Sequence, residues 1–189
     1  MKRTFENVYQ LKLAMKGITP QIWRRIQVPE NYTFFDLHEA IQVVMDWDDY
    51  HLHEFEMLNP KTVKLDRIGA KGDDHDYFGD KSLVLEKKTK LSDYFKMENK
   101  DALYTYDFGD NWHVKVRLEK ILPRMEGVEY PVCTEGKRAS VPEDSGGIGG
   151  YMYKLEVLKD PQHEDYEDTL EWIGEDFDPE YFDPKEVSF

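Results

Sequence analysis

The chain has 189 residues, 40% of them hydrophobic and 14% aromatic, and it carries a formal net charge of −14. This length can bury one full core without disulfides or a metal. We therefore expect a single domain spanning residues 1–189, with a core over about residues 5–175 and an acidic, aromatic tail over residues 176–189. The charge repels phosphate backbones and disfavours direct binding of nucleic acid, whereas it favours a protein partner, in particular a basic one.

The single cysteine, Cys133, excludes an internal disulfide and is typical of a protein in a reducing compartment. No apolar run approaches the roughly 18 residues that a membrane-spanning helix needs. The N-terminal residues lack the apolar stretch of a signal peptide. These features predict a cytoplasmic protein that does not associate with membranes.

Alternating apolar and polar residues predict a first strand over residues 8–17, a turn over residues 17–20 and a second strand over residues 22–29. Arg24 falls on the inward face of the second strand, between apolar residues. A buried charge needs compensation, so we expect either a buried carboxylate partner for Arg24 or a bulge near Trp23.

Residues 33–47 predict a helix, in which Thr33 and Asp36 have the spacing of a capping box. Apolar residues recur along it at helical spacing, at Phe34, Leu37, Ile41, Val44 and Met45. Residues 47–57 follow as a strand. Hairpin, helix and strand in this order are how a β-grasp unit begins, so we expect a ββαβ, β-grasp-like N-terminal half.

Residues 59–82 are polar and acidic and predict a long surface excursion, and residues 91–95 predict a short helix. Residues 103–108 and 112–122 predict a second hairpin, in whose turn we expect Gly109 to adopt a positive φ.

The chain from residue 123 to residue 150 is rich in Pro and Gly and predicts loops. A helix is expected to begin near Gly150. Another is expected to begin at Asp160, with Pro161 in its first turn, and to end at Gly174. The aromatic tail is expected to close over the core. This mixed order predicts an α+β fold with a mainly antiparallel sheet and helices packed on it.

Two histidines, His51 and His53, are the most concrete functional feature of the sequence. Strand alternation places both on one face, and histidines so spaced can bind one Zn²⁺ or Mn²⁺, although nothing in the sequence requires a cofactor. Two rings hydrogen-bonded at the rim of the core are the alternative. The candidates for further ligands are Glu143, Asp144, His163 and Asp107.

A binding face for a protein partner is the other candidate site. We expect it to combine the stretch around the two histidines with the loop after residue 141, and to consist of Trp47, Asp49, Tyr50, His51, His53, Glu143, Asp144 and Tyr151. Trp23, Trp47, Tyr50 and Trp172 are expected to be exposed aromatic residues, a type enriched at protein interfaces.

Four stretches together resemble the plasmid pRiA4b ORF-3-like family: YQLKLAMKGITPQIWRRIQVP, DLHEAIQVVMDWDDYHLHEFEM, YTYDFGDNWHVKVRLE and PEDSGGIGGY with HEDYEDTLEWIGEDFDPEYFD. The chain looks close to an archaeal member of unknown function. The resemblance implies an α+β fold and an occurrence on plasmids and near mobile elements, with no agreed activity or catalytic residues. Many relatives carry cysteines where this chain has Ser140 and Ser145. If those cysteines bind metal together with Cys133, this chain has lost that option.

Two interpretations follow. The favoured one is a non-enzymatic binding or interaction module associated with plasmid or mobile-element biology. The alternative is a divalent-metal-dependent hydrolase or nuclease-like enzyme that uses the His51/His53 pair, with Glu54 as general base. Strand alternation counts against Glu54, because it points to the face opposite the histidines.

Overall fold

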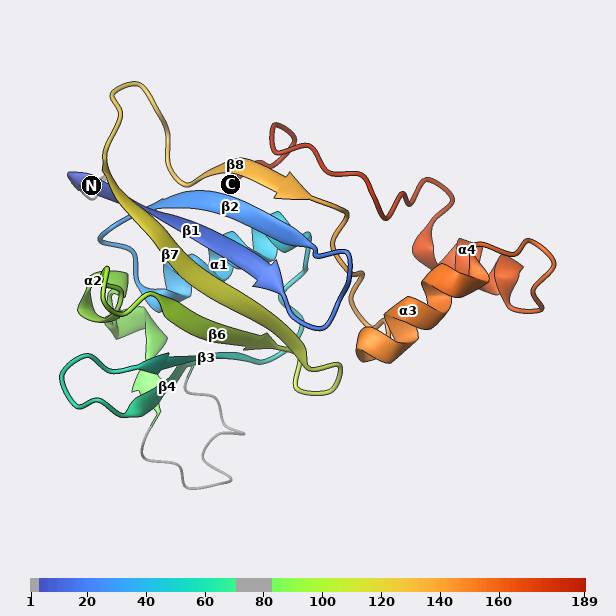
Figure 1. The fold of residues 1–189 in the computed structure, drawn as a ribbon, viewed down its shortest axis with the longest axis horizontal. Helices are drawn as coiled ribbons and strands as arrows, with labels where there is room; N and C mark the ends of the chain where they lie inside the picture. Colours follow the sequence, from blue (N-terminus) through green and yellow to red (C-terminus); the bar gives the residue numbers. More distant parts are fainter. Residues whose placement is uncertain (1–3, 71–82) are drawn as a thin grey trace.

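An eight-stranded sheet forms the body of the molecule (Figure 1). It comes from a computed structural model that describes residues 4–70 and 83–189. The elements are β1 (Asn7–Met15), β2 (Trp23–Pro29), α1 (Phe34–Met45), β3 (His53–Leu58), β4 (Leu65–Gly69), β5 (Val84–Leu85), a 3₁₀ helix (Glu86–Lys88), α2 (Leu91–Tyr94), β6 (Asp101–Tyr106), β7 (Trp112–Pro123), β8 (Val132–Lys137), α3 (Gly147–Val157) and α4 (Tyr166–Ile173).

The strand order in the sheet is β5-β4-β3-β6-β7-β1-β2-β8. Neighbouring strands are antiparallel except β4 and β5, which are parallel. The α+β class with a mainly antiparallel sheet is thereby confirmed. The β-grasp-like arrangement is not: β1, β2, α1 and β3 follow in the expected chain order, but β6 and β7 lie between β3 and the first hairpin.

Helix α1 lies behind the sheet in the view of Figure 1 and covers one of its faces. The capping box is confirmed, because Asp36 N–H donates to Thr33 Oγ1 and Thr33 N–H donates to Asp36 Oδ2. The apolar residues at helical spacing, among them Phe34, Leu37 and Ile41, are buried in the core. The spacing of these residues therefore determines which side of α1 faces the sheet.

The other face of the sheet carries ion pairs. Arg25 pairs with Glu119 at 2.6 Å and also with Glu135. Lys115 lies 3.5 Å from Asp101 on the neighbouring strand. Opposite charges on this face therefore offset one another in part.

Arg24 is buried as predicted, but neither expected explanation for it is right. Its Nε donates to Val44 O at 2.9 Å, and its Nη1 donates to Trp23 O and Lys137 O at 3.0 Å each. Val44 lies in the last turn of α1, which contains no basic residue of its own. Arg24 therefore supplies, from the sheet, the donor and the positive charge that the C-terminal end of a helix attracts. Burial lowers the pKa of Arg24 to about 10.

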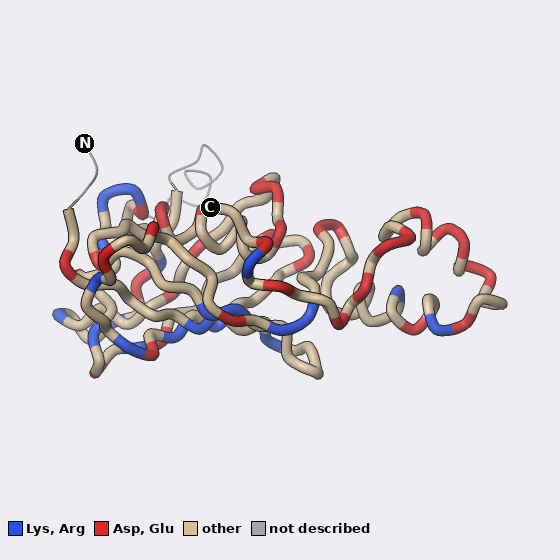
Figure 2. Tube along the Cα trace, turned by 90° about the horizontal axis from the view of Figure 1, so that it is seen from above, with Lys and Arg blue, Asp and Glu red and all other residues tan. Residues whose placement is uncertain are grey.

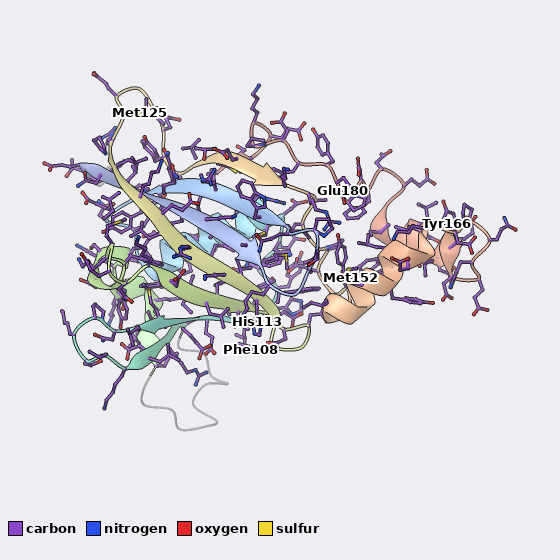
Figure 3. The ribbon with its side chains drawn as sticks, viewed as in Figure 1. Phe108, His113, Met125, Met152, Tyr166 and Glu180 are labelled. Atoms are coloured by element: carbon purple, nitrogen blue, oxygen red, sulfur yellow. The ribbon has the colours of Figure 1, made fainter. Side chains whose placement is uncertain are left out.

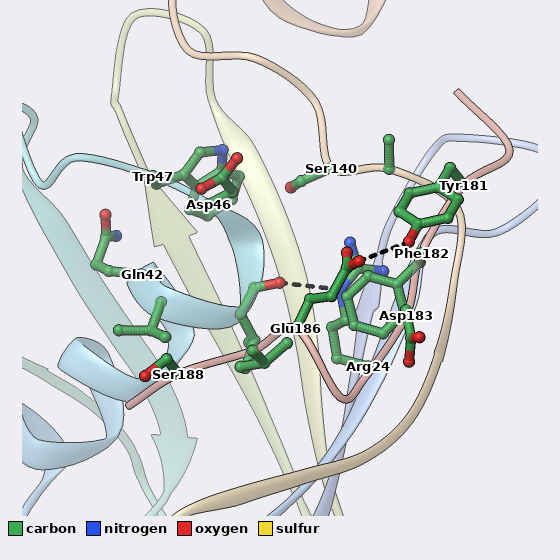
Figure 4. A pocket seen from close by; sticks show the side chains of 14 residues that line it. Arg24, Gln42, Asp46, Trp47, Ser140, Tyr181, Phe182, Asp183, Glu186 and Ser188 are labelled. Atoms are coloured by element: carbon green, nitrogen blue, oxygen red, sulfur yellow. Dashed lines mark hydrogen bonds between the residues drawn. The ribbon is translucent and has the colours of Figure 1, made fainter. Parts of the chain in front are cut away.

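The C-terminal tail closes over this arginine, as expected. The Phe182 ring lies 3.7 Å from the Arg24 guanidinium carbon, and Phe177 and Val187 also pack against the core. Figure 4 shows Phe182 beside Arg24 in a pocket of about 590 Å³ between the end of α1 and the tail.

Helices α3 and α4 extend from one side of the sheet, and many Asp and Glu residues lie along this extension (Figure 2). The end of α4 at Gly174 is confirmed, but its predicted N-cap at Asp160 is wrong by five positions, since Asp165 is the N-cap. Asp160 N–H donates to Val157 O and its side chain accepts from Gln162 N–H. The Asp160 side chain thus forms a local turn after α3 instead of capping a new helix.

Part of the predicted surface excursion is ordered as a strand, since β4 occupies residues 65–69 within it. The rest of that prediction, over residues 71–82, falls outside the described residues. The short helix expected near residue 91 is confirmed as α2. Among the described residues, no helix is both long and apolar enough to cross a membrane.

Candidate functional site

Three loops meet at one end of the sheet: residues 47–52 after α1, residues 107–111 between β6 and β7, and residues 141–147, which lead into α3 and include its first residue. Hydrogen bonds join each loop to another. Asp107 N–H donates to Leu52 O at 2.9 Å, and Gly146 N–H donates to Asp110 Oδ2 at 3.0 Å. We call this surface the three-loop face.

Glu143 joins its loop to a second loop and to the end of β6 through its two carboxylate oxygens. Oε2 accepts from Asp48 N–H at 2.8 Å and Oε1 accepts from the Tyr106 hydroxyl. Burial and this carboxylate raise the pKa of Tyr106. The Trp47 ring stacks on Tyr106 at 4.8 Å and donates its indole N–H to Val141 O. The predicted exposure of Trp47 is therefore wrong, because its side chain packs beneath the face.

The backbone of these loops and their edges contains residues in the left-handed conformation. They are Asp46 (φ 53), Asp49 (φ 58), Asp107 (φ 56), Asn111 (φ 59) and Asp144 (φ 56). Asp and Asn tolerate this conformation better than other residues with a side chain. The predicted positive φ of Gly109 is wrong: the flanking Asp107 and Asn111 take it, while Gly109 N–H donates to Asp107 Oδ1 at 2.8 Å.

His51 belongs to the three-loop face and precedes β3, because the strand predicted from residue 47 begins only at His53. Its Nε2 lies 3.3 Å from Asp144 Oδ1 and 3.7 Å from Asp107 Oδ2. This nitrogen is buried and makes no hydrogen bond. The chain bends at His51 before β3 begins, so strand alternation does not extend back to it.

His53 lies elsewhere, at the start of β3 and on its buried side. Its Nε2 is 2.7 Å from Glu86 Oε2, and its ring stacks face to face on His38 with centroids 3.4 Å apart. His51 and His53 therefore contact different carboxylates. The expectation that both rings face one ion from the same strand is wrong in this structure.

His38 is the centre of a buried hydrogen-bond chain. Its Nδ1 lies 2.8 Å from the Tyr104 hydroxyl, which accepts from Gln42 Nε2, and its Nε2 lies 3.0 Å from Asp49 Oδ1. Gln42 Oε1 accepts from Asp49 N–H. The Gln42 side-chain amide determines which group donates in each of these hydrogen bonds. Because it donates to the Tyr104 hydroxyl, Tyr104 donates to His38 Nδ1, and His38 donates from Nε2 to Asp49. Burial, followed by the nearby His53, lowers the pKa of His38 to about 3.

Two members of this buried cluster, His38 and Glu86, were not predicted from the sequence. Helical spacing could have identified His38, because it lies one turn after Phe34 on the face that α1 buries. Nothing local marks Glu86, which stands before Lys87 and Lys88 and yet is buried. Glu86 Oε1 makes no hydrogen bond.

The remaining candidates divide between the surface and the core. Tyr50 is 78% exposed on the three-loop face. Tyr151 is fully buried, so its predicted place on a binding surface is wrong. His163 lies in the turn before α4, where its Nδ1 accepts from Asp165 N–H at 3.1 Å, and it belongs to neither histidine–carboxylate cluster found among the described residues.

Those two clusters are His38, Asp49 and His53, and His51, Asp107 and Asp144. The first is poorly arranged for a metal. Imidazole lone pairs lie in the ring plane, and the His38 and His53 planes are 7° from parallel and stacked, so both cannot point at one ion. Each Nε2 also already contacts a carboxylate. This cluster is arranged as a hydrogen-bonded network.

Three comparisons place the chain among known proteins. The model of the plasmid pRiA4b ORF-3-like protein family matches residues 7–186. An uncharacterised protein of Sinorhizobium fredii is 34% identical over 168 residues, which cover 89% of this chain and 81% of that protein. A crystal structure of a protein of unknown function from Methanosarcina mazei Go1 is 76% identical, with a TM-score of 0.92 over 98% of this chain and 100% of the other. The chain therefore belongs to the plasmid pRiA4b ORF-3-like family.

Proposed function

We propose that the protein is a non-enzymatic binding module that uses the three-loop face to hold a basic segment of a protein partner. The charge of the face supports this proposal. It contains Asp48, Asp49, Asp107, Asp110, Glu143 and Asp144, and none of its three loops contains Lys or Arg. A surface of one sign attracts a partner of the opposite sign and orients it during approach.

Exposed apolar side chains on the same loops favour a peptide that combines charged with apolar residues. Tyr50, Leu52 and Phe108 are 78%, 43% and 43% exposed. Figure 3 shows Phe108 at the turn between β6 and β7. Aromatic rings beside carboxylates suit a segment that combines Lys or Arg with apolar residues, because a cation can lie over the ring while its charge is balanced nearby.

The loops are also held in place before any partner binds. Glu143 joins residues 47–52 to residues 141–147, and Asp110 joins the β6–β7 turn to Gly146. A surface that is already ordered loses less conformational entropy on binding, which favours affinity. The network therefore supports recognition as its role.

A nucleic-acid-binding protein is the class of partner that we favour, because such proteins present basic segments, and because the family is named after a plasmid gene. The alternative enzyme, a metal-dependent hydrolase built on His51 and His53, has less support. It needs both rings on one ion, and the two rings face different carboxylates.

Fluorescence anisotropy with labelled peptides tests this proposal. We expect a Lys/Arg-rich peptide containing apolar residues to bind, to weaken as salt is raised, and to lose about three- to tenfold in affinity with Tyr50→Ala. Tyr153→Ala removes a comparably exposed aromatic residue on α3 and serves as the control. Equal binding of an acidic peptide of the same length, or an unchanged affinity with Tyr50→Ala, would contradict the proposal.

A further inference from the structure

We propose that His51, Asp107 and Asp144 form a binding site for a divalent transition-metal ion, Zn²⁺ or Mn²⁺. This ligand set differs from the pair expected from the sequence, because it contains only one of the two neighbouring histidines. It does not depend on the peptide-binding proposal.

The distances between the three side chains fit an ion. His51 Nε2 lies 3.3 Å from Asp144 Oδ1 and 3.7 Å from Asp107 Oδ2, and one potential ligand atom from each residue lies within 4.8 Å of the other two. Around a tetrahedral ion with bonds of about 2.0–2.1 Å, neighbouring ligand atoms lie about 3.3–3.4 Å apart. Small side-chain adjustments would therefore bring all three ligands into coordination.

The second observation concerns the hydrogen bonding of His51 Nε2. This nitrogen is buried and makes no hydrogen bond, although two carboxylate oxygens lie close to it. A buried nitrogen without a hydrogen bond is unsatisfied, and the two carboxylates beside it place negative charge at the same point. A metal ion held by all three side chains would satisfy the nitrogen and balance the two charges.

The surroundings hold two of the ligands in place and leave the third adjustable. Asp107 Oδ1 accepts from Gly109 N–H, which leaves Oδ2 directed to His51, and the His51 ring packs edge-on against Tyr106. The Asp144 side chain is 74% exposed and can adjust to an ion. Nearby Glu143 is already bonded through both oxygens, so it acts as a positioning residue and not as a ligand.

The choice of metal follows from the ligand types. Imidazole favours Zn²⁺ over the hard cations, while carboxylates accept Zn²⁺ and Mn²⁺. With three protein ligands, an ion would keep at least one position for solvent. The site is therefore an open one at the surface of the three-loop face.

Isothermal titration of the chelator-treated full chain with ZnCl₂ and MnCl₂ tests the proposal. We expect one saturable ion per chain, and a loss of affinity of about tenfold or more for Asp144→Asn and for His51→Ala. Asp46→Asn is the matched control, because Asp46 is also exposed and left-handed and undergoes the same change of charge. His163→Ala is a second control, on a histidine outside the site.

Two results would overturn the metal site. The first is the absence of saturable binding of either ion. The second is an equal loss of affinity with Asp46→Asn, which would show a diffuse acidic field instead of coordination. Because these titrations contain no peptide, either result leaves the peptide-binding proposal to its own test.

Discussion

The rings of His38 and His53 lie face to face, with centroids 3.4 Å apart and planes 7° from parallel. Two imidazolium cations at this distance would repel strongly in a buried setting. The hydrogen bonds allow His38 to remain neutral, with its one N–H directed to Asp49 and its other nitrogen accepting from Tyr104. The stack is therefore compatible with at most one charged ring.

The low pKa of His38 predicts a loss of stability in acid. Its pKa falls from 6.5 to about 3 on folding, so between these values the unfolded chain binds a proton that the folded chain does not. The free energy of unfolding therefore decreases as the pH falls below about 6.5, by up to about 1.4 kcal/mol per pH unit from this group. We expect urea unfolding of His38→Gln to show a shallower pH dependence than the parent chain. The same dependence of the free energy of unfolding on pH in His38→Gln and the parent chain would contradict this expectation.

Replacing Arg24 should be far more costly than replacing its neighbour Arg25. Arg24→Ala leaves three carbonyl acceptors without their donor, so we expect a loss of more than about 3 kcal/mol in the free energy of unfolding. Arg25→Ala removes only partly exposed ion pairs and should cost about 1 kcal/mol or less. Chemical denaturation measures both. Equal losses would show that Arg24 does not have the role assigned to it at the end of α1.

Glu143→Ala should loosen the three-loop face without unfolding the sheet. The change removes the acceptor for Asp48 N–H and for the Tyr106 hydroxyl, so hydrogen exchange over residues 47–51 should become about tenfold faster or more. Asp144→Asn, at the next and exposed position, is the control and should leave this exchange unchanged. Unchanged exchange in Glu143→Ala would mean that other contacts hold the loops.

Gly136 and Gly149 should respond in opposite directions to replacement by Ala. A Cβ at Gly136 would lie 2.3 Å from the Phe182 ring and 2.9 Å from Trp23 O, so Gly136→Ala should displace the tail and cost about 1–3 kcal/mol. A Cβ at Gly149 meets nothing within 4 Å, and Gly149→Ala should stabilise α3 by up to about 1 kcal/mol. Thermal unfolding measures both, and limited proteolysis reports whether residues 177–187 detach.

Patterns that span a few residues were sufficient to predict much of the fold. The capping box at Thr33 and the apolar spacing after it identified α1, and alternation identified β1, β2, β6 and β7. These signals depend on the periods of helix and strand and need no knowledge of distant partners. The order of the strands in the sheet has no such local signal, which is why the β-grasp-like expectation was not confirmed.

The contacts that form the site join residues that lie far apart in the sequence. Arg24 looked misplaced because two of its acceptors lie far from it in the sequence: Val44 O is at the end of α1, and Lys137 O is in β8. His53 contacts Glu86, and His51 contacts Asp144, across separations that no spacing rule covers. The expected binding face combined the stretch around the histidines with the loop after residue 141, and Glu143 does accept a hydrogen bond from Asp48 N–H between these two segments.

The left-handed positions around the three-loop face restrict how this surface can change. Asp46, Asp49, Asp107, Asn111 and Asp144 all occupy a conformation that Asp, Asn and Gly adopt with little strain. Exchanging Asp for Asn at any of them alters the charge by one unit and leaves the main chain as it is. Single substitutions can therefore change the net charge of the three-loop face by one unit at a time without changing its backbone. The same loops could then bind partners of different charge.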